Sequence, residues 1–253
     1  DPNQQSLLDR MAAPMTRDSA GTLHLAGTDQ LGRDVFSRVI YGMRVSLLIA
    51  IGAVIISGIG GILLGLVAGY RGGPLDLLIM RCVDFQMAFP GLLLAIFLLY
   101  LIGSSILNLV VLISVLGWVS YARIVRAQTL AVKSLPFIEG AIAIGATDSR
   151  IILRHILPQL VPVIATVAVL DFVSVILAEA GLSFLGLGIQ PPTSSLGRMI
   201  ADGEEQIFTG GWWLFGIPGA AIFFLVLCAN LTSRWIQDLT GRALPAGQRR
   251  KEA

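Results

Sequence analysis

The sequence predicts an all-α protein that crosses a membrane several times. Only 13% of its 253 residues are charged, against about 25% in a typical soluble domain, and the mean hydropathy is +0.80. Continuous apolar runs of about 20 residues are long enough to be transmembrane helices. A β-barrel is excluded, because barrel strands are short and alternate apolar with polar residues.

Five apolar runs supply the expected transmembrane helices. Pro90 and Gly91 interrupt the second run, and such a break lines a cavity, acts as a pivot or is a tolerated kink. Trp212 and Trp213 open the last run, and we expect both at a membrane–water interface. The runs extend approximately over Val45–Tyr70, Leu77–Ile102, Ile106–Ile124, Leu160–Leu182 and Trp212–Thr232.

Lysine and arginine concentrate in alternate loops, which indicates an orientation. Loop 183–211 holds a single basic residue, Arg198, whereas the loop after the third run and the C-terminal tail hold five each. Basic loops stay in the cytoplasm, so we expect a cytoplasmic tail and an external N-terminal segment. Because that segment starts outside without a signal peptide, we expect a sixth helix upstream of Asp1. The basic residues are Arg123, Arg126, Lys133, Arg150 and Arg154 in the loop, and Arg234, Arg242, Arg249, Arg250 and Lys251 in the tail.

Three sequence blocks stand in a fixed order between or beside the apolar runs. They are HLAGTDQLGRDVFSRVIYGMRVSL at 24–47, EGAIAIGATDSRIILRHILP at 139–158 and LSFLGLGIQPP at 182–192. With these blocks the chain resembles the inner-membrane permease subunits of bacterial ABC importers, in the dipeptide/oligopeptide/nickel branch. The second block is similar to the family's EAA loop, with Gly140 where the family has alanine and His155 where it has isoleucine.

The resemblance implies a division of the chain into three parts in the bacterial inner membrane. Residues 1–44 would be a periplasmic segment with a helix leading into the first span. Residues 45–232 would be the transmembrane permease domain, with a cytoplasmic coupling loop at 126–158 and a periplasmic loop at 183–211. Residues 233–253 would be a basic cytoplasmic tail.

The residues of the second block predict two short helices joined by a sharp turn. Pro136 and the residues after it open the first helix, with Glu139 at its positive end. Gly145 ends this helix or lets a partner approach its backbone, and Thr147 or Asp148 caps a second helix over 149–155. We expect Pro158 to break the chain before the fourth span.

The resemblance implies that this block seats in a cleft of an ATP-binding subunit. A second permease chain, two ATPase subunits and a periplasmic binding protein would complete the importer. ATP and Mg²⁺ would bind the ATPases, since neither Lys133 nor Lys251 lies in a phosphate-binding Gly-x-x-x-x-Gly-Lys-Ser/Thr loop. We therefore expect no enzymatic activity, cofactor or metal on this chain. The expected coupling residues are Glu139, Gly140, Ala141, Gly145, Ala146, Asp148, Leu157 and Pro158. The alternative is an interfacial loop with solvated charges.

Asp171, Glu179 and Pro90 are candidates for the translocation path. Asp171 lies near the middle of the fourth run, where a carboxylate costs about 2.5–3.5 kcal/mol to insert. It either faces a water-filled path, meeting a peptide amine or a metal ion, or makes an interhelical hydrogen bond. Glu179 lies near the outer end of the same run, where we expect it to be solvated rather than to line a gate.

Other patterns predict structure rather than chemistry. Asp34 and Arg38 are expected to pair at i, i+4 on the helix that leads into the first span. The run 58–69, GIGGILLGLVAG, predicts a close helix–helix contact, within this chain or with a partner permease. His24 and His155 have no ligand spacing, so neither predicts a metal site.

Two rival functions remain open. An ion-coupled secondary transporter would use Asp171, but such proteins carry several intramembrane ionisable residues and an internal repeat. A membrane scaffold without transport would not depend on the 139–158 block. Substrates of the family branch include dipeptides, oligopeptides, glutathione, nickel complexes and opine-like compounds, and short peptides are favoured by their frequency alone.

Overall fold

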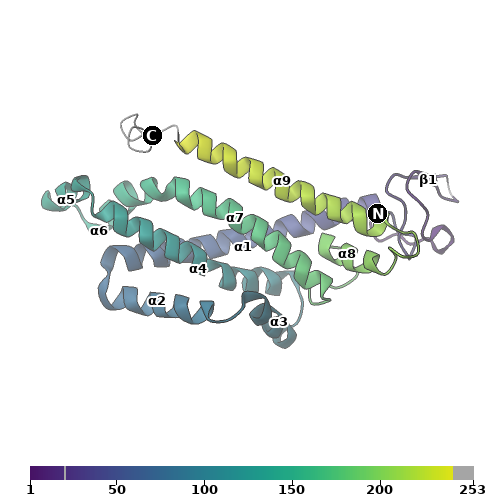
Figure 1. The fold of residues 1–253 in the computed structure, drawn as a ribbon, viewed down its shortest axis with the longest axis horizontal. Helices are drawn as coiled ribbons and strands as arrows, with labels where there is room; N and C mark the ends of the chain where they lie inside the picture. Colours follow the sequence, from purple (N-terminus) through teal and green to yellow (C-terminus); the bar gives the residue numbers. More distant parts are fainter. Residues whose placement is uncertain (20, 242–253) are drawn as a thin grey trace. The chain divides into compact units, whose positions relative to one another are not determined.

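The computed structural model describes residues 1–19 and 21–241, with side chains through Trp235. The basic tail residues Arg242, Arg249, Arg250 and Lys251 lie outside this part of the chain. Two two-residue strands, β1 (Thr16–Arg17) and β2 (Leu23–His24), form an antiparallel hairpin before the first long helix. The helical segments, labelled in Figure 1 where there is room, are η1 (Leu7–Asp9), α1 (Val35–Arg71), α2 (Gly73–Met87), α3 (Gly91–Ile102), α4 (Ile106–Lys133), α5 (Pro136–Ala143), α6 (Asp148–Ile151), the π-helical η2 (Ile152–Ile156), α7 (Leu157–Phe184), α8 (Leu196–Glu204) and α9 (Trp213–Gly241).

The predicted spans are present, with three differences. Four helices of the described chain are long and apolar enough to cross a membrane, and α2 with α3 makes a fifth if that pair is one span. The first span and the helix expected to lead into it are one helix, α1, which starts at Val35. The second is broken, because α2 and α3 meet at a bend of 85°. Pro90 lies in this break; it lacks an N–H donor and disfavours helical backbone at Phe89. The fourth span continues back to Asp148 without interruption.

The chain forms two compact units. Among the described residues, one comprises 1–53, 92–112 and 173–227, and the other comprises 54–91, 113–172 and 228–241. Several long helices contribute to both units. Each unit has buried apolar clusters of its own and is described separately below.

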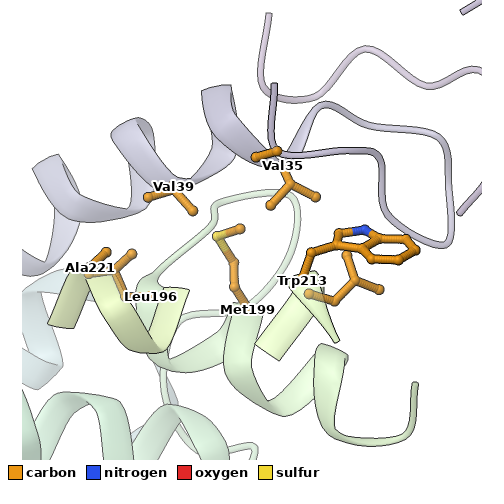
Figure 2. Close-up of a cluster of buried hydrophobic side chains, with 8 residues drawn as sticks. Val35, Val39, Leu196, Met199, Trp213 and Ala221 are labelled. Atoms are coloured by element: carbon orange, nitrogen blue, oxygen red, sulfur yellow. The ribbon is translucent and has the colours of Figure 1, made fainter. Parts of the chain in front are cut away.

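The core of the first unit joins the N-terminal segment to α1, α8 and α9. Figure 2 shows Val35 and Val39 of α1 facing Leu196 and Met199 of α8. Trp213 belongs to this cluster: it is 7% exposed, and its Nε1 donates a 3.1 Å hydrogen bond to the carbonyl of Thr28. Its ring therefore packs against the N-terminal segment, and the expectation that Trp213 lies at a membrane interface stays a prediction.

Glycines set the contact between α1 and α4 in the second unit. A Cβ at Gly61 would lie 2.4 Å from the carbonyl oxygen of Trp118, and one at Gly65 would lie 2.7 Å from that of Ala122. Gly69 makes a similar approach to Arg126. The close contact predicted for 58–69 is therefore made within this chain, since only residues without a side chain permit such backbone distances.

Candidate functional site

The 139–158 block forms the predicted pair of short helices. Pro136 occupies the first turn of α5, and Leu135 is its N-cap. Glu139 lies in that first turn and is exposed, so its carboxylate is near the positive end of the helix dipole. Ile138 and Ala141 point the other way and are buried. The helix thus has one packed face and one open face.

Gly145 ends α5, as predicted, through a Schellman motif. Its φ is +81°, a conformation that favours glycine. Its N–H donates to the carbonyl of Ile142 at 2.9 Å, and the N–H of Ala146 donates to that of Ala141 at 3.1 Å. A Cβ at Gly145 would meet no atom within 4 Å. Its requirement for glycine in this chain is therefore conformational.

The second short helix differs from the prediction. Thr147 occupies the N-cap position, and α6 runs only from Asp148 to Ile151 before the π-helical turn η2 begins. Pro158 does not break the chain, and the expectation that it would is wrong. Proline in a helix lacks the N–H and collides with the carbonyl four residues before it. The wider π turn directly before α7 changes that spacing and lets the helix continue through Pro158.

The packed face of the loop is buried against the ends of α1 and α4. Ile138 of α5, Ile151 of α6 and Ile156 of η2 are each no more than 1% exposed. They share a cluster with Tyr70 and Val125. Leu157 packs at the edge of this cluster, and Pro158 is exposed. The loop is therefore seated on the transmembrane helices rather than extended into solvent.

Polar contacts reinforce this seating. The Tyr70 hydroxyl donates a 2.9 Å hydrogen bond to Oδ1 of Asp148. Lys133 donates from Nζ to the Tyr70 carbonyl at 2.5 Å, with Nζ 5.1 Å from the centre of the tyrosine ring. Arg126 holds Asp76 through two parallel hydrogen bonds, one of them 2.6 Å from Nη2 to Oδ2. The first contact joins α1 to the loop, the second joins the end of α4 to α1, and the third joins α4 to α2.

The open face of the loop is hollowed and exposes large apolar side chains beside charged ones. Ile144 is 87% exposed and Phe137 46% exposed. A hollow of about 560 Å³ lies on this face. Large exposed apolar residues around a hollow on a helical loop are suited to contact with another protein. The hollow is lined by Phe137, Gly140, Ala141, Ile144, Gly145, Ala146, Arg150 and His155.

Asp171 makes an interhelical hydrogen bond. Its Oδ2 accepts from the Ser57 hydroxyl of α1 at 3.1 Å, and its Oδ1 lies 3.5 Å from the place a Cβ on Gly117 would take. The Tyr121 ring is fully buried nearby on α4, and its hydroxyl lies close to both Asp171 and Ser57. The interhelical alternative for Asp171 is therefore realised. A role in a translocation path stays a prediction.

Glu179 is buried, so the expectation that it is solvated is wrong. Its side chain is among the largest fully buried ones, at 1% exposure. Oε2 accepts from Ser46 at 2.9 Å and Oε1 from Ser183 at 2.7 Å. Ser195 extends this network by a 3.3 Å hydrogen bond to Ser183. The carboxylate thus joins α1, α7 and the residue that caps α8.

The polar residues before α1 pair differently from the prediction. Arg38 bonds to the buried Asp29, not to Asp34. Asp34 instead accepts from the N–H of Ser37 at 2.8 Å and lies 2.8 Å from Nδ1 of His24. This hydrogen bond, partly opposed by burial and supported by Asp18, raises the pKa of His24. Across residues 1–19 and 21–241, no three His, Cys, Asp or Glu side chains are grouped to hold a metal ion.

Sequence reasoning missed Tyr70 and Asp76. Both lie near the end of an apolar run, where a polar side chain is unremarkable in sequence. Their partners follow much later in the chain, at Asp148 and Arg126. A signal for Asp76 was its position in the first turn of the helix after Pro74, but nothing local indicated Arg126 as its partner.

The sequence pattern of one family matches residues 61–244, most of the chain. That family is described as "Binding-protein-dependent transport system inner membrane component". The protein belongs to this family. The match places the chain among inner-membrane transport components, and four candidate spans are present in its described part.

Named relatives cover most of the chain. The chain is 38% identical over 241 residues to the di/tripeptide transport system permease protein DppC of Pseudomonas aeruginosa, covering 94% of this chain and 78% of the relative. It is 40% identical over 215 residues to the dipeptide permease DppC of Bacillus subtilis, with 85% and 67% covered. It is 39% identical over 221 residues to the glutathione permease GsiD of Pectobacterium atrosepticum, with 87% and 73% covered.

Solved transporters share the fold. A chain of the inward-facing MetNI methionine ABC transporter superposes with a TM-score of 0.67 at 17% identity, covering 81% of this chain and 96% of that one. A chain of an amino acid ABC transporter crystallised with histidines gives a TM-score of 0.57 at 18% identity, with 83% and 95% covered. At these identities the likeness establishes the fold.

Proposed function

We propose that this transport component is the permease subunit of an ABC importer for short peptides. It forms the translocation path with a second, homologous permease chain. Separate ATPase subunits bind below, and a periplasmic binding protein delivers the solute from above. The support is the family, together with relatives whose names specify dipeptides, di/tripeptides and glutathione.

One observation carries the mechanical part of the proposal. The open face of the 139–158 loop exposes large apolar side chains, with Ile144 87% exposed, while the isoleucines of its other face are buried in a cluster with residues of α1 and α4. A loop that only lay in the membrane interface would not need such tight seating. A loop that receives force from a partner does, because a loosely held loop would move without the helices.

The same proposal assigns the remaining parts. The loop faces the cytoplasm, the C-terminus is cytoplasmic, and ATP and Mg²⁺ are bound by the partner ATPases rather than by this chain. Asp171, Glu179 and Pro90 border the path, with Asp171 the candidate to meet a peptide amine. Each bound partner shifts the transporter between its states only by its different affinity for them.

Co-purification tests the proposal. The tagged chain is extracted in mild detergent from its native host, and mass spectrometry identifies what comes with it. Gly140 is the position to vary, because it is exposed on α5 and a Cβ there would meet no atom within 4 Å. Gly140→Arg places a long charged side chain on the open face, and Gly140→Ala is the matched control.

The expected result is that ATPase subunits accompany the wild type and Gly140→Ala but are at least tenfold depleted with Gly140→Arg. Equal recovery with both variants would show that the loop is not the docking site. Absence of any ATPase from the wild-type preparation would overturn the importer proposal. In that event an ion-coupled transporter centred on Asp171 is the function to test next.

A further inference from the structure

We infer that Tyr70 is the positioning residue that links the coupling loop to the first long helix. This inference rests on the importer function proposed above and deepens it. It specifies which span follows the loop when an ATPase moves it, and through which side chain.

Tyr70 lies one residue before the end of α1 and is 6% exposed. Its ring is part of the buried cluster that includes Ile138 of α5 and Ile151 of α6. Its hydroxyl donates to Asp148, the first residue of α6. One side chain therefore shares a buried cluster with residues of both short helices and makes a hydrogen bond to a charged acceptor on α6, which is among the stronger kinds.

The main chain at the same position is held independently. Lys133, the last residue of α4, donates to the Tyr70 carbonyl, and its ammonium lies over the tyrosine ring. The preceding residue, Gly69, is so close to α4 that an added Cβ would lie 2.7 Å from Thr129. The end of α1 thus cannot move far from α4, while the side chain of Tyr70 is bonded to the loop.

The hydrogen bond between Tyr70 and Asp148 connects the end of α1 to the start of α6. Asp148 itself is exposed, and one of its carboxylate oxygens accepts from the hydroxyl of the buried Tyr70. The hydrophobic effect has no preferred direction, whereas a hydrogen bond requires one donor to lie opposite one acceptor. The hydrogen bond fixes the register between α1 and α6. Displacement of the loop is then passed to α1 as well as to the directly connected α4 and α7.

The test measures whether α1 follows the loop. Spin labels are attached at Leu63 of α1 and Ser149 of α6, both exposed, after the exposed Cys82 and Cys228 are replaced by serine. The chain is purified with its co-purifying ATPases and reconstituted in lipid nanodiscs. The distance between the labels is measured by pulsed electron spin resonance without nucleotide and with a non-hydrolysable ATP analogue.

Tyr70→Phe removes only the hydroxyl. Tyr41→Phe is the matched control, because Tyr41 is an exposed tyrosine near the other end of the same helix. In the wild type and the control, the analogue should leave the distance unchanged. In Tyr70→Phe it should shift the distance by about 1–2 Å, the size of typical helix displacements, or broaden it.

Each outcome is decisive. An unchanged distance in Tyr70→Phe, with ATPases bound as in the wild type, would overturn the positioning role. Loss of the ATPases from Tyr70→Phe alone would also overturn it, since the hydroxyl would then maintain the docking surface. If no ATPase accompanies the wild type, the importer proposal fails first and the inference with it.

Discussion

The hydroxyl of Ser46 donates a 2.9 Å hydrogen bond to the carboxylate of Glu179, which follows it in sequence by 133 residues. Both side chains are 1% exposed, and the second carboxylate oxygen accepts from Ser183. A buried polar group that loses its partner costs more free energy than the hydrogen bond contributed. This network therefore holds α1 against α7 within the first unit, and its members depend on one another.

Replacing Glu179 with alanine should destabilise the chain, because two buried serine hydroxyls lose their acceptor. The expected loss in unfolding free energy is about 1–3 kcal/mol. Glu179→Gln keeps one acceptor oxygen, and its amide N–H can donate a hydrogen bond to either serine oxygen. This variant should therefore lose less unfolding free energy than Glu179→Ala. Unfolding of the purified chain in mixed micelles by dodecyl sulfate provides the measurement. Equal midpoints for the two variants would contradict this account.

Gly61→Val should disrupt the contact between α1 and α4. The added Cβ would lie 2.4 Å from a main-chain oxygen of α4, which cannot turn away. Overpacking of this kind costs about 1–3 kcal/mol or more. The adjacent Gly60→Val is the control: it has the same helix propensity change, and its Cβ would meet no atom within 4 Å. The yield of monodisperse protein should fall for Gly61→Val alone, and a comparable fall for both would refute the contact.

Ser57 and Asp171 should show measurable coupling in a double-mutant cycle. Ser57→Ala and Asp171→Leu each remove the hydrogen bond between α1 and α7. Interhelical hydrogen bonds of this type contribute about 0.6 kcal/mol on average in membranes. The unfolding midpoints of the two single variants and the double variant give the coupling energy. Strict additivity would mean that the bond contributes nothing to stability and that Asp171 is retained for another reason.

Gly145→Ala should loosen the turn between α5 and α6. At φ +81° an alanine costs about 1–2 kcal/mol, because its Cβ crowds the following carbonyl. The amide of Ala146, which closes the turn by bonding to Ala141, should exchange with deuterium several-fold faster. Gly140→Ala, on the same loop but within α5, should leave exchange unchanged or slower. Identical exchange in both variants would argue against a conformational requirement at Gly145.

The hairpin before α1 should lose stability as the pH rises. The hydrogen bond to Asp34 holds the pKa of His24 above its ordinary value of about 6.5, despite the opposing effect of burial. The charged histidine therefore stabilises the folded segment fully below that ordinary value, and this contribution disappears as the pH rises through the higher folded-state pKa. Burial opposes the shift at Asp34, but its bonds to His24 and Ser37 prevail and lower its pKa, so its contribution is lost only in acid.

Deuterium exchange over residues 16–24 at pH 6 and pH 8.5 checks this prediction. Exchange corrected for its intrinsic pH dependence should increase at the higher pH in the wild type. In His24→Gln, which can still donate to Asp34 but carries no titratable charge, the increase should be absent. A wild-type segment equally protected at both values would contradict the role assigned to His24.

Much of the architecture follows from local sequence. The positions of the long helices, the break at Pro90, the glycine that ends α5 and the start of that helix at Pro136 were all predictable. Each depends on hydropathy over one span or on the backbone preference of one residue. The prediction that Pro158 breaks the chain was wrong for a local reason as well. The π turn before this residue lets the helix continue, and no residue propensity indicated that turn.

Partner choice was not predictable in this way. Sequence spacing paired Asp34 with Arg38, whereas the folded chain pairs Asp34 with His24 and Arg38 with Asp29. The position of Glu179 near the outer end of an apolar run predicted a solvated side chain, whereas the fold buries it among serines. A side chain can pair with any group that the fold brings near it, and its neighbours in sequence are only some of these groups.

The sequence by itself determined the class of this protein: a helical membrane component with a structured loop between its third and fourth spans, because hydropathy and the order of its motifs are carried by contiguous residues. Only the tertiary structure decided what that loop rests on. The Tyr70–Asp148 hydrogen bond and the Gly61–Trp118 approach join residues that lie 78 and 57 positions apart in the sequence. Such contacts arise from packing between helices, whose geometry no local pattern contains.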